Sequence, residues 1–367
     1  MEFGRNSRQA MELKNIIRPE IISQRAYQAG DVACRVKLDA NENPFPMPSE
    51  LKRKFIRSLG KISLHRYPAA GSPALIRRLA ASLGVESDMI LVGNGSDELI
   101  QVLCTATGRP GAAVLIPAPT FVMYRISALN NGLNPLEVPL DEAFGLDLDA
   151  MRRQIRQQAP ALTFLSYPNN PTGNCFPRAS IERIIKESPG IVVVDEAYFH
   201  FSGKTFLPDL SRYENLVILR SLSKVGLAAM RIGLLVGPRS LICELNKVRL
   251  PYNLNAFSQA AAEFFVDHES DFITQTQEIM RLREELVREL ATIRQVQAYP
   301  TEANFIFFRC TMDANRIYGG LLHRGVMVRN FHAPGILWNC LRVTVGSQEE
   351  NLLFVDALRG VINELGA

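Results

Sequence analysis

The sequence contains no uninterrupted apolar run of about 18 residues, which is the length that a membrane-spanning helix needs. It also has no Cys-x-x-Cys pair, so its six widely spaced cysteines form no zinc ribbon or thioredoxin-type motif. We interpret them as reduced, mostly buried thiols of a cytoplasmic protein. Basic residues exceed acidic residues by only 41 − 37 = 4, too few to indicate a nucleic-acid partner. We therefore expect neither a membrane nor a nucleic acid among its partners.

Metal and nucleotide motifs are missing as well. There is no HExxH and no GxSxG, and the five histidines are scattered, so we expect no metal site. The segment 93–95 (GNG) resembles the start of a dinucleotide-binding fingerprint, but Glu98 stands where its third glycine belongs. The segment 203–205 (GKT) resembles the end of a Walker A loop, but Tyr198 occupies the place of the first glycine. Support for a nucleotide site is therefore weak.

What the sequence does contain is an alternation of short apolar runs and helical periods. Hydrophobic residues make up 47% of the 367 residues and charged residues 21%, which is typical of a globular chain with a sizeable core. Continuous runs such as IVVV suit strands covered on both faces, as in a parallel sheet. The pattern predicts a doubly wound α/β layer, with strands at Met89–Val92, Ala112–Ile116, Leu133–Val138, Leu162–Ser166, Ile191–Val194, Leu216–Leu219 and Ile232–Val236.

The pattern of predicted helices and strands changes after about residue 267. A long amphipathic segment, 271–294, precedes three further predicted strands, Ala303–Phe308, Val326–Arg329 and Leu341–Val345. We therefore predict four parts. Residues 1–10 are an expression leader, or alternatively a native polar arm, and residues 11–48 form an arm that joins the second domain. A large domain spans 49–267, and a small α+β domain spans 268–367.

Polar residues follow several predicted strands at their carboxyl ends, where open α/β sheets bind cofactors. Asp195 follows the fifth predicted strand, Lys224 the sixth and Asn170 the fourth. Taken alone, Asp195 could instead cap a helix, and Asn170 could be a turn residue.

A second group of residues is suited to a phosphate. The segment Gly95-Ser96-Asp97 turns into a helix, whose first N–H groups and positive dipole end attract an anion. Arg231, seven residues after Lys224, could add a bidentate contact. A lysine for a Schiff base, a carboxylate for a ring nitrogen and a phosphate cradle together suit pyridoxal phosphate.

An ordered series of motifs resembles the fold-type I pyridoxal-phosphate-dependent aminotransferases. Within this group, the resemblance is to the histidinol-phosphate aminotransferases and their close relatives. The motifs that carry it extend over nearly the whole chain. The motifs are Lys37–Pro46 (KLDANENPFP), His65–Pro68 (HRYP), Gly93–Glu98 (GNGSDE), Tyr167–Gly173 (YPNNPTG), Val194–Tyr198 (VDEAY), Ser221–Lys224 (SLSK), Pro251–Asn255 (PYNLN) and Leu341–Gly346 (LRVTVG).

The resemblance implies a large domain with a seven-stranded, mostly parallel sheet between helices, and a small α+β domain. It implies that Lys224 holds pyridoxal 5'-phosphate and moves a proton, and that Asp195 pairs with the ring nitrogen. Tyr198 and Asn170 would bond the phenolic oxygen O3′, and Phe121 would stack on the ring. The cofactor phosphate would lie among Gly95, Ser96, Asp97, Ser221, Ser223 and Arg231, with Tyr67 reaching it from the neighbouring subunit of a homodimer.

Substrate residues are also implied by the resemblance. Arg342 would bind the carboxylate of 2-oxoglutarate or glutamate and the phosphate of histidinol phosphate, and Arg329 would help with the phosphate. Tyr27 and Asn43, both in the arm, would reach the same substrates. Ordinary surface positions are the alternative for both arginines, and a helix-capping role is the alternative for each serine.

The implied activity is transamination of L-histidinol phosphate with 2-oxoglutarate. An aminotransferase for aromatic amino acids and a threonine-phosphate decarboxylase remain alternatives on the same scaffold, as does a non-catalytic ligand sensor. Two residues depart from the family pattern: Phe121 replaces a tyrosine, and His200 replaces an acid two residues after Tyr198. Phenylalanine keeps the stacking surface but loses the hydroxyl group.

Overall fold

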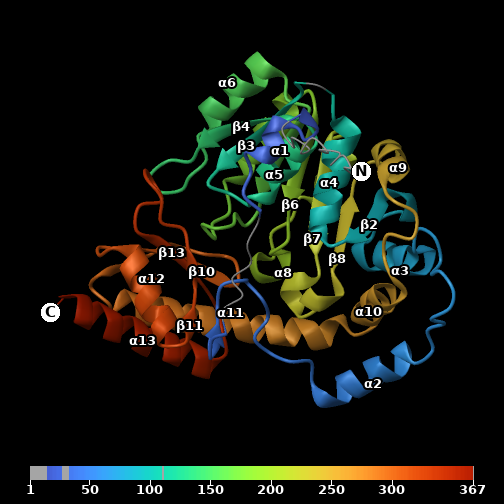
Figure 1. Ribbon diagram of the computed structural model, residues 1–367. Helices are drawn as coiled ribbons and strands as arrows, with labels where there is room; N and C mark the ends of the chain where they lie inside the picture. Colours follow the sequence, from blue (N-terminus) through green and yellow to red (C-terminus); the bar gives the residue numbers. More distant parts are fainter. Residues whose placement is uncertain (1–14, 27–32, 110, 367) are drawn as a thin grey trace, which may run out of the picture.

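A seven-stranded sheet forms the centre of the larger part of the molecule (Figure 1). The structure is a computed structural model that describes residues 15–26, 33–109 and 111–366. Strand β8 runs antiparallel to both of its neighbours, β2 and β7. The other four pairs of neighbouring strands are parallel. The predicted mostly parallel sheet is therefore confirmed. Its order is β2 (Ile90–Asn94), β8 (Ile232–Val236), β7 (Leu216–Ser221), β6 (Ile191–Asp195), β5 (Leu162–Ser166), β3 (Ala113–Ala118) and β4 (Asn134–Pro139).

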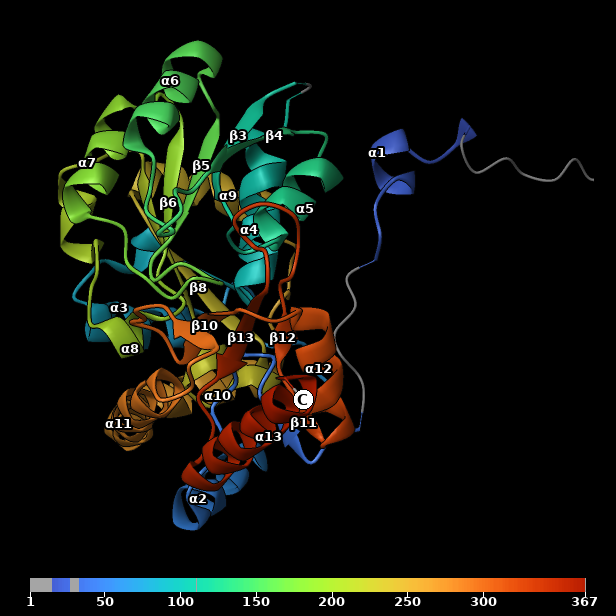
Figure 2. The same ribbon diagram turned by 90° about the vertical axis from the view of Figure 1, so that its left-hand side faces the viewer.

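Helices cover both faces of this sheet (Figure 2). Successive side chains of a strand point to opposite faces, so Val192 and Val194 pack in one core cluster and Val193 in the other. This two-sided burial explains why the central strands are apolar without alternation. The Val193 face lies under α4 (Ser96–Thr107), α5 (Met123–Asn130) and α9 (Arg239–Val248), and the opposite face lies under α3 (Pro73–Leu83), α6 (Leu148–Gln158), α7 (Arg178–Glu187) and α10 (Ala256–Asp267). Helix α2 (Ser49–Leu59) packs on α10 rather than on the sheet.

Capping residues determine where several of these helices begin or end. Gly84 adopts a left-handed conformation, φ 67°, and ends α3, as glycine does readily because it has no side chain. Asp147 caps α6 by accepting a hydrogen bond from the backbone N–H of Ala150 at 2.8 Å. Asn255 caps α10 in the same way through the N–H of Ser258 at 2.9 Å.

The second part of the molecule is built on a four-stranded sheet, order β12-β13-β10-β9, in which the neighbouring strands are antiparallel. The predicted strand Val326–Arg329 is wrong as one piece, because its two ends pair with different partners. Its first half pairs in parallel with β1 of the arm and its second half with β13. The elements are β1 (Val36–Lys37), α11 (Glu269–Ala291), β9 (Val296–Ala298), β10 (Phe305–Cys310), α12 (Ala314–His323), β11 (Val326–Met327), β12 (Arg329–Asn330), β13 (Cys340–Thr344) and α13 (Gln348–Gly366).

The remaining short helices are α1 (Pro19–Ile22) and α8 (Phe199–Ser202). Within the described ranges, no helix combines the length and the apolar character that a membrane crossing requires. The six cysteines are free thiols, and three of them, Cys104, Cys310 and Cys340, are buried. The domain boundaries remain predictions, and the predicted leader at residues 1–10 lies outside the described residues.

Candidate active site

The candidate site lies at the carboxyl ends of β5, β6 and β7. Asp195 is the last residue of β6, and Lys224 follows β7 in a short 3-10 turn, Ser223–Val225. Asn170 lies in the loop after β5 and accepts a hydrogen bond from the guanidinium of Arg342 on β13. Because neighbouring parallel strands end at one edge of the sheet, these residues from distant parts of the chain meet there.

Lys224 has the environment of a reactive amine. Its Nζ donates to the backbone oxygen of Ala40 at 3.3 Å. Burial, together with the positive charge of Arg342, lowers the pKa of Lys224 to about 8. An exposed lysine stays protonated until about pH 10. Lys224 therefore reaches the neutral, nucleophilic state much closer to neutral pH.

Asp195 is a buried carboxylate, with 3% of its surface exposed. It accepts hydrogen bonds from the Tyr124 hydroxyl at 2.6 Å and from the Ala197 N–H at 2.9 Å, and both donors are uncharged. Burial raises the pKa of Asp195 to about 6, although these hydrogen bonds act in the opposite direction. A protonated ring nitrogen would supply the positive charge that a buried carboxylate requires.

Tyr124 is a site residue that the sequence analysis missed. It is buried in α5, stacks on Phe164 with ring centroids 4.6 Å apart, and meets Phe121 edge to face at 5.5 Å. Burial and the charge of Asp195 hold its pKa well above the ordinary value, so its hydroxyl remains a hydrogen-bond donor. No sequence signal marks it, because its partner Asp195 lies 71 residues away in the chain.

The predicted phosphate residues also come together. Gly95, φ 82°, precedes α4, and a side chain there would lie 2.5 Å from the guanidinium of Arg231. Arg231 bonds Asp97 at 2.9 Å and the Ser223 hydroxyl at 3.3 Å. A Cβ at Gly233 would lie 2.5 Å from the backbone at Gly95. The segment before α4 and the segment that leads into β8 are thus in close contact at the start of α4. The N–H groups of α4 and the Arg231 guanidinium are donors that suit a phosphate.

Two serines complete this cradle. Ser96 is the first residue of α4, where the N–H groups have no helical acceptors. The Ser221 hydroxyl accepts a hydrogen bond from the Ser223 N–H at 3.1 Å, so it also stabilises the turn that carries Lys224. The place of Ser221 at the phosphate remains a prediction.

Arg342 and Arg329 face each other across the antiparallel strands β13 and β12 as direct register partners. Arg342 is 6% exposed, bonds the backbone oxygen of Asp39, and lies 5.1 and 5.3 Å from the rings of Phe305 and Phe331. Two like charges directly opposite each other in a sheet are destabilising. An anion bound between them removes this repulsion, so the pair is suited to a dianionic substrate.

The remaining predicted residues lie in the arm and in an exposed segment, and Asn43 lies beside the turn that follows Lys224, 3.2 Å from where a Cβ at Gly226 would be. Tyr67 is 81% exposed and stacks on Tyr252 with centroids 4.6 Å apart. Asn43 donates from its amide to Gln275 of α11 at 3.0 Å and accepts from the N–H of Phe45. Tyr27 lies outside the described residues.

His200 is packed between aromatic rings, 5.3 Å from Phe199 and 6.1 Å from Phe265. Burial lowers its pKa to about 4, and the nearby charge of Arg220 acts in the same direction. The imidazole is therefore neutral at physiological pH. This departure from the family pattern replaces an acid with an uncharged packing residue.

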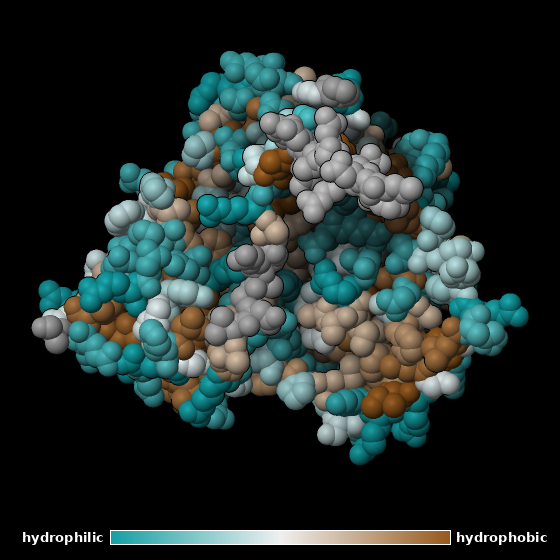
Figure 3. Space-filling model, in the orientation of Figure 1, coloured by the Kyte–Doolittle hydropathy of each residue, from teal (hydrophilic) through white to brown (hydrophobic). Residues whose placement is uncertain are grey.

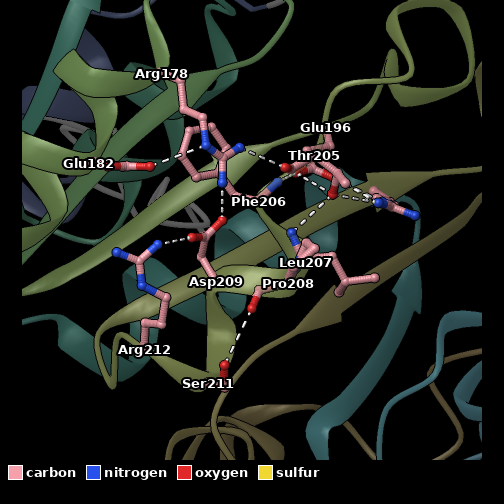
Figure 4. Close-up of polar contacts among 11 residues, drawn as sticks. Arg178, Glu182, Glu196, Thr205, Phe206, Leu207, Pro208, Asp209, Ser211 and Arg212 are labelled. Atoms are coloured by element: carbon pink, nitrogen blue, oxygen red, sulfur yellow. Dashed lines mark hydrogen bonds and ion pairs between the residues drawn. The ribbon is translucent and has the colours of Figure 1, made fainter.

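A polar network that the sequence analysis did not identify begins at Glu196, directly after Asp195 (Figure 4). Glu196 is buried and accepts two hydrogen bonds from Arg220, at 3.0 and 2.8 Å. It also accepts from the hydroxyl of Thr205 and the N–H of Phe206. Because Glu196 adjoins Asp195 and Arg220 adjoins Ser221, this buried ion pair ties the ends of β6 and β7 together. The outer part of the network contains Arg178, Asp209 and Arg212.

This fold, with a half-buried lysine of lowered pKa, a buried carboxylate and an anion cradle at one edge of the sheet, defines a pyridoxal-phosphate-dependent enzyme. The profile of the family described as aminotransferase class I and II matches residues 35–358. The chain belongs to this family of aminotransferases, and its cofactor is pyridoxal 5'-phosphate.

Individual relatives are similar over nearly their whole length. The chain is 45% identical to histidinol-phosphate aminotransferase 2 of Nitrosococcus oceani, over 94% of this chain and 96% of the relative. It is 41% identical to the histidinol-phosphate aminotransferase of Aquifex aeolicus, over 93% and 97%. The crystal structure of the Sinorhizobium meliloti histidinol-phosphate aminotransferase with pyridoxal-5'-phosphate has a TM-score of 0.87 at 22% identity, covering 95% and 98%.

Proposed function

We propose that this aminotransferase transfers the amino group of L-histidinol phosphate to 2-oxoglutarate, giving imidazole-acetol phosphate and L-glutamate in a step of histidine biosynthesis. The observation that carries the proposal is the direct pairing of Arg329 with Arg342 beside Asn170. A substrate phosphate carries two negative charges, and two guanidinium groups can neutralise both. The names of the similar aminotransferases support the same substrate.

We further propose a role for each cofactor residue. When bound, pyridoxal phosphate supplies an electron-withdrawing ring that stabilises negative charge on the substrate carbon. Lys224 forms the covalent link and carries the proton from that carbon, which a neutral amine can accept. Asp195 keeps the ring nitrogen protonated, because a buried carboxylate favours a neighbouring positive charge. Tyr198 and Asn170 bond O3′.

We propose that the remaining residues bind the cofactor ring and phosphate and fix their orientation. Phe121 supplies an aromatic surface for the ring, and its edge-to-face contact with Tyr124 fixes its position. The phosphate is held by residues from the two loops that meet beside Gly233: Gly95, Ser96, Asp97, Ser221, Ser223 and Arg231. Asp97 is an acid in this set, and its ion pair with Arg231 orients the guanidinium.

Two substrate residues, Tyr27 and Asn43, belong to the same proposal through their place in the arm. The neighbouring loop binds the site directly, since Asp39 and Ala40 accept hydrogen bonds from Arg342 and Lys224. The arm therefore contacts both the substrate arginine and the catalytic lysine.

We propose that the active protein is a cytoplasmic homodimer in which Tyr67 reaches the neighbouring subunit's cofactor phosphate. An exposed aromatic residue stacked on another, Tyr252, is suited to an interface. Figure 3 shows apolar side chains gathered over the region of α2 and α10. Exposed apolar residues in this part of the chain are Ile56, Leu64, Leu250 and Phe257.

The test is a single-turnover experiment without a keto acid. The cofactor-loaded protein is mixed with L-histidinol phosphate, L-phenylalanine or L-threonine phosphate, and loss of its visible absorption is followed, with Lys224→Ala as the inactive control. Conversion that is fastest with histidinol phosphate supports the proposal. Preference for phenylalanine would indicate an aromatic aminotransferase, and carbon dioxide from threonine phosphate a decarboxylase. Ligand binding without turnover would indicate a sensor.

A further inference from the structure

We infer that Asn41 is a positioning residue that sets the direction in which Tyr198 donates its hydroxyl proton. The inference rests on the proposed role of Tyr198 at the cofactor oxygen O3′. The side-chain amide of Asn41 donates to Tyr198 Oη at 2.9 Å. Both residues are buried, with 2% and 3% of their surfaces exposed.

The orientation of the Asn41 amide follows from its other contacts. The hydroxyl of Thr344 accepts the backbone N–H of Asn41 at 2.9 Å. The same hydroxyl donates to Asn41 Oδ1 at 3.3 Å. With Oδ1 facing Thr344, the NH₂ group faces Tyr198. The Asn41 backbone oxygen accepts from the amide of Asn304 at 3.0 Å, which fixes the residue further.

The direction of the Tyr198 proton follows from this geometry. A phenol has one proton to donate and a lone pair with which to accept. Because Asn41 donates to Tyr198 Oη, the proton points away from Asn41 and toward another acceptor. Accepting one hydrogen bond also makes a hydroxyl a stronger donor in the next. Asn41 therefore favours donation by Tyr198 toward O3′.

The position of Asn41 also connects Tyr198 to the substrate arginine. Three consecutive residues contact three site groups: Asp39 accepts from Arg342, Ala40 accepts from Lys224, and Asn41 donates to Tyr198. Asn41 has φ 55°, in the left-handed region. This conformation turns the chain so that neighbouring residues can face different groups, and asparagine tolerates it better than most residues do.

The test is a pH titration of the visible absorption of the cofactor-loaded protein. Donation from Tyr198 stabilises negative charge on O3′, most strongly when the cofactor–lysine nitrogen is unprotonated, so it lowers the pKa of that nitrogen. We expect Tyr198→Phe to raise this pKa. Asn41→Gly removes the amide but tolerates the backbone conformation, and we expect a rise of about half a unit. Asn41→Asp, whose carboxylate accepts the Tyr198 proton, should raise it further.

Asn339→Gly is the matched control. Asn339 is also buried and left-handed, φ 56°, but it accepts from the N–H of Ala314 at the start of α12. It should leave the absorption pKa unchanged. The double variant Asn41→Gly/Tyr198→Phe should shift no further than Tyr198→Phe alone, because Asn41 acts through the hydroxyl.

The outcomes separate the two hypotheses. A shift in Tyr198→Phe without one in Asn41→Gly overturns the role of Asn41 and leaves that of Tyr198 intact. No shift in Tyr198→Phe overturns the proposed role of Tyr198 and the inference that rests on it. A further shift in the double variant also contradicts the inference, since Asn41 would then act by another route. Cofactor dissociation constants, measured on the same variants, verify that each protein is loaded.

Discussion

At the scale of single residues, two ionisable groups of the candidate site, Asp195 and Lys224, have pKa values displaced toward each other. Burial raises the pKa of Asp195 to about 6 and lowers that of Lys224 to about 8. Both shifts oppose the charged state, because neither group is well solvated. In the cofactor-free protein, Asp195 is ionised above pH 6 and Lys224 is neutral above pH 8.

A pH dependence of cofactor capture follows. Formation of a Schiff base requires a neutral amine, so the rate at which the cofactor-free protein binds pyridoxal phosphate covalently should rise as pH increases through about 8. Stopped-flow absorption across pH 6 to 10 measures this rate. A midpoint near that of an exposed lysine, about 10.4, would contradict the assigned environment of Lys224.

Ionised Asp195 should lower the free energy of unfolding of the cofactor-free protein. Its folded pKa is raised, so the folded state loses stability as pH rises from about 4 to 6, and the full cost persists above 6. We expect Asp195→Asn to stabilise the cofactor-free protein at pH 7.5 by up to about 3 kcal/mol, and to lose most of the transamination. Thermal denaturation of the cofactor-free variants measures the first effect. An unchanged melting temperature would show that Asp195 is well solvated or paired.

Sequence could indicate candidate site residues that stand in recognisable motifs, such as Lys224 in SLSK and Asp195 in VDEAY, and their roles remain predictions. It could not identify Tyr124 or Asn41, because their roles arise from contacts with Asp195 and Tyr198, 71 and 157 residues away in the chain. Tyrosine and asparagine are also common as core and turn residues, so neither residue type points to function by itself.

At the scale of elements, the pairing of β12 with β13 underlies the proposed anion site. It places Arg329 opposite Arg342, which follows it by 342 − 329 = 13 residues in the chain. Arg342 is buried and is tied to Asn170 and to the arm loop through Asp39, whereas Arg329 is only partly buried. The two arginines should therefore contribute differently.

We expect Arg342→Ala to weaken both half-reactions, because we propose that this arginine binds both the carboxylate of the keto acid and the phosphate of the amino donor. Arg329→Ala should raise KM mainly for the phosphorylated donor, by about 10- to 100-fold, the loss expected for one charge-assisted pair. Separate half-reaction kinetics with histidinol phosphate and glutamate test this. Loss confined to one substrate in Arg342→Ala would mean that the anion sites are separate.

Elements with strong apolar periodicity were predictable. The strands of the large sheet lie within one or two residues of the predicted ranges, since each carries its own Val/Ile/Leu signal. The antiparallel direction of β8 and the division between β11 and β12 were not predictable. Both depend on which strand lies alongside, and a local pattern does not contain that information.

At the scale of the whole molecule, the proposed shared sites can be tested by complementation. A Lys224→Ala subunit has a dead site of its own but an intact Tyr67 for its neighbour. A Tyr67→Ala subunit has the reverse defect. Hybrid dimers formed by mixing the two should regain activity above the sum of the separate variants, because one complete site is assembled.

The matched control for this experiment is a mixture of Lys224→Ala with Asp195→Asn. Both changes lie within the same site of one subunit, so no hybrid assembles a complete site. Recovery in this control would mean that subunit exchange is not the cause. No recovery with Tyr67→Ala, despite exchange verified by mass spectrometry, would contradict the proposed reach of Tyr67 into its neighbour.

The antiparallel direction of β8 has a mechanical consequence. A parallel successor to β7 would need a long crossover connection, whereas β8 returns directly after the turns that carry Lys224 and Arg231. The proposed covalent anchor, Lys224, and the proposed phosphate anchor, Arg231, thus belong to one short stretch of backbone. A displacement of this stretch would move both anchors together, so it would translate the cofactor proposed to bind there rather than twist it.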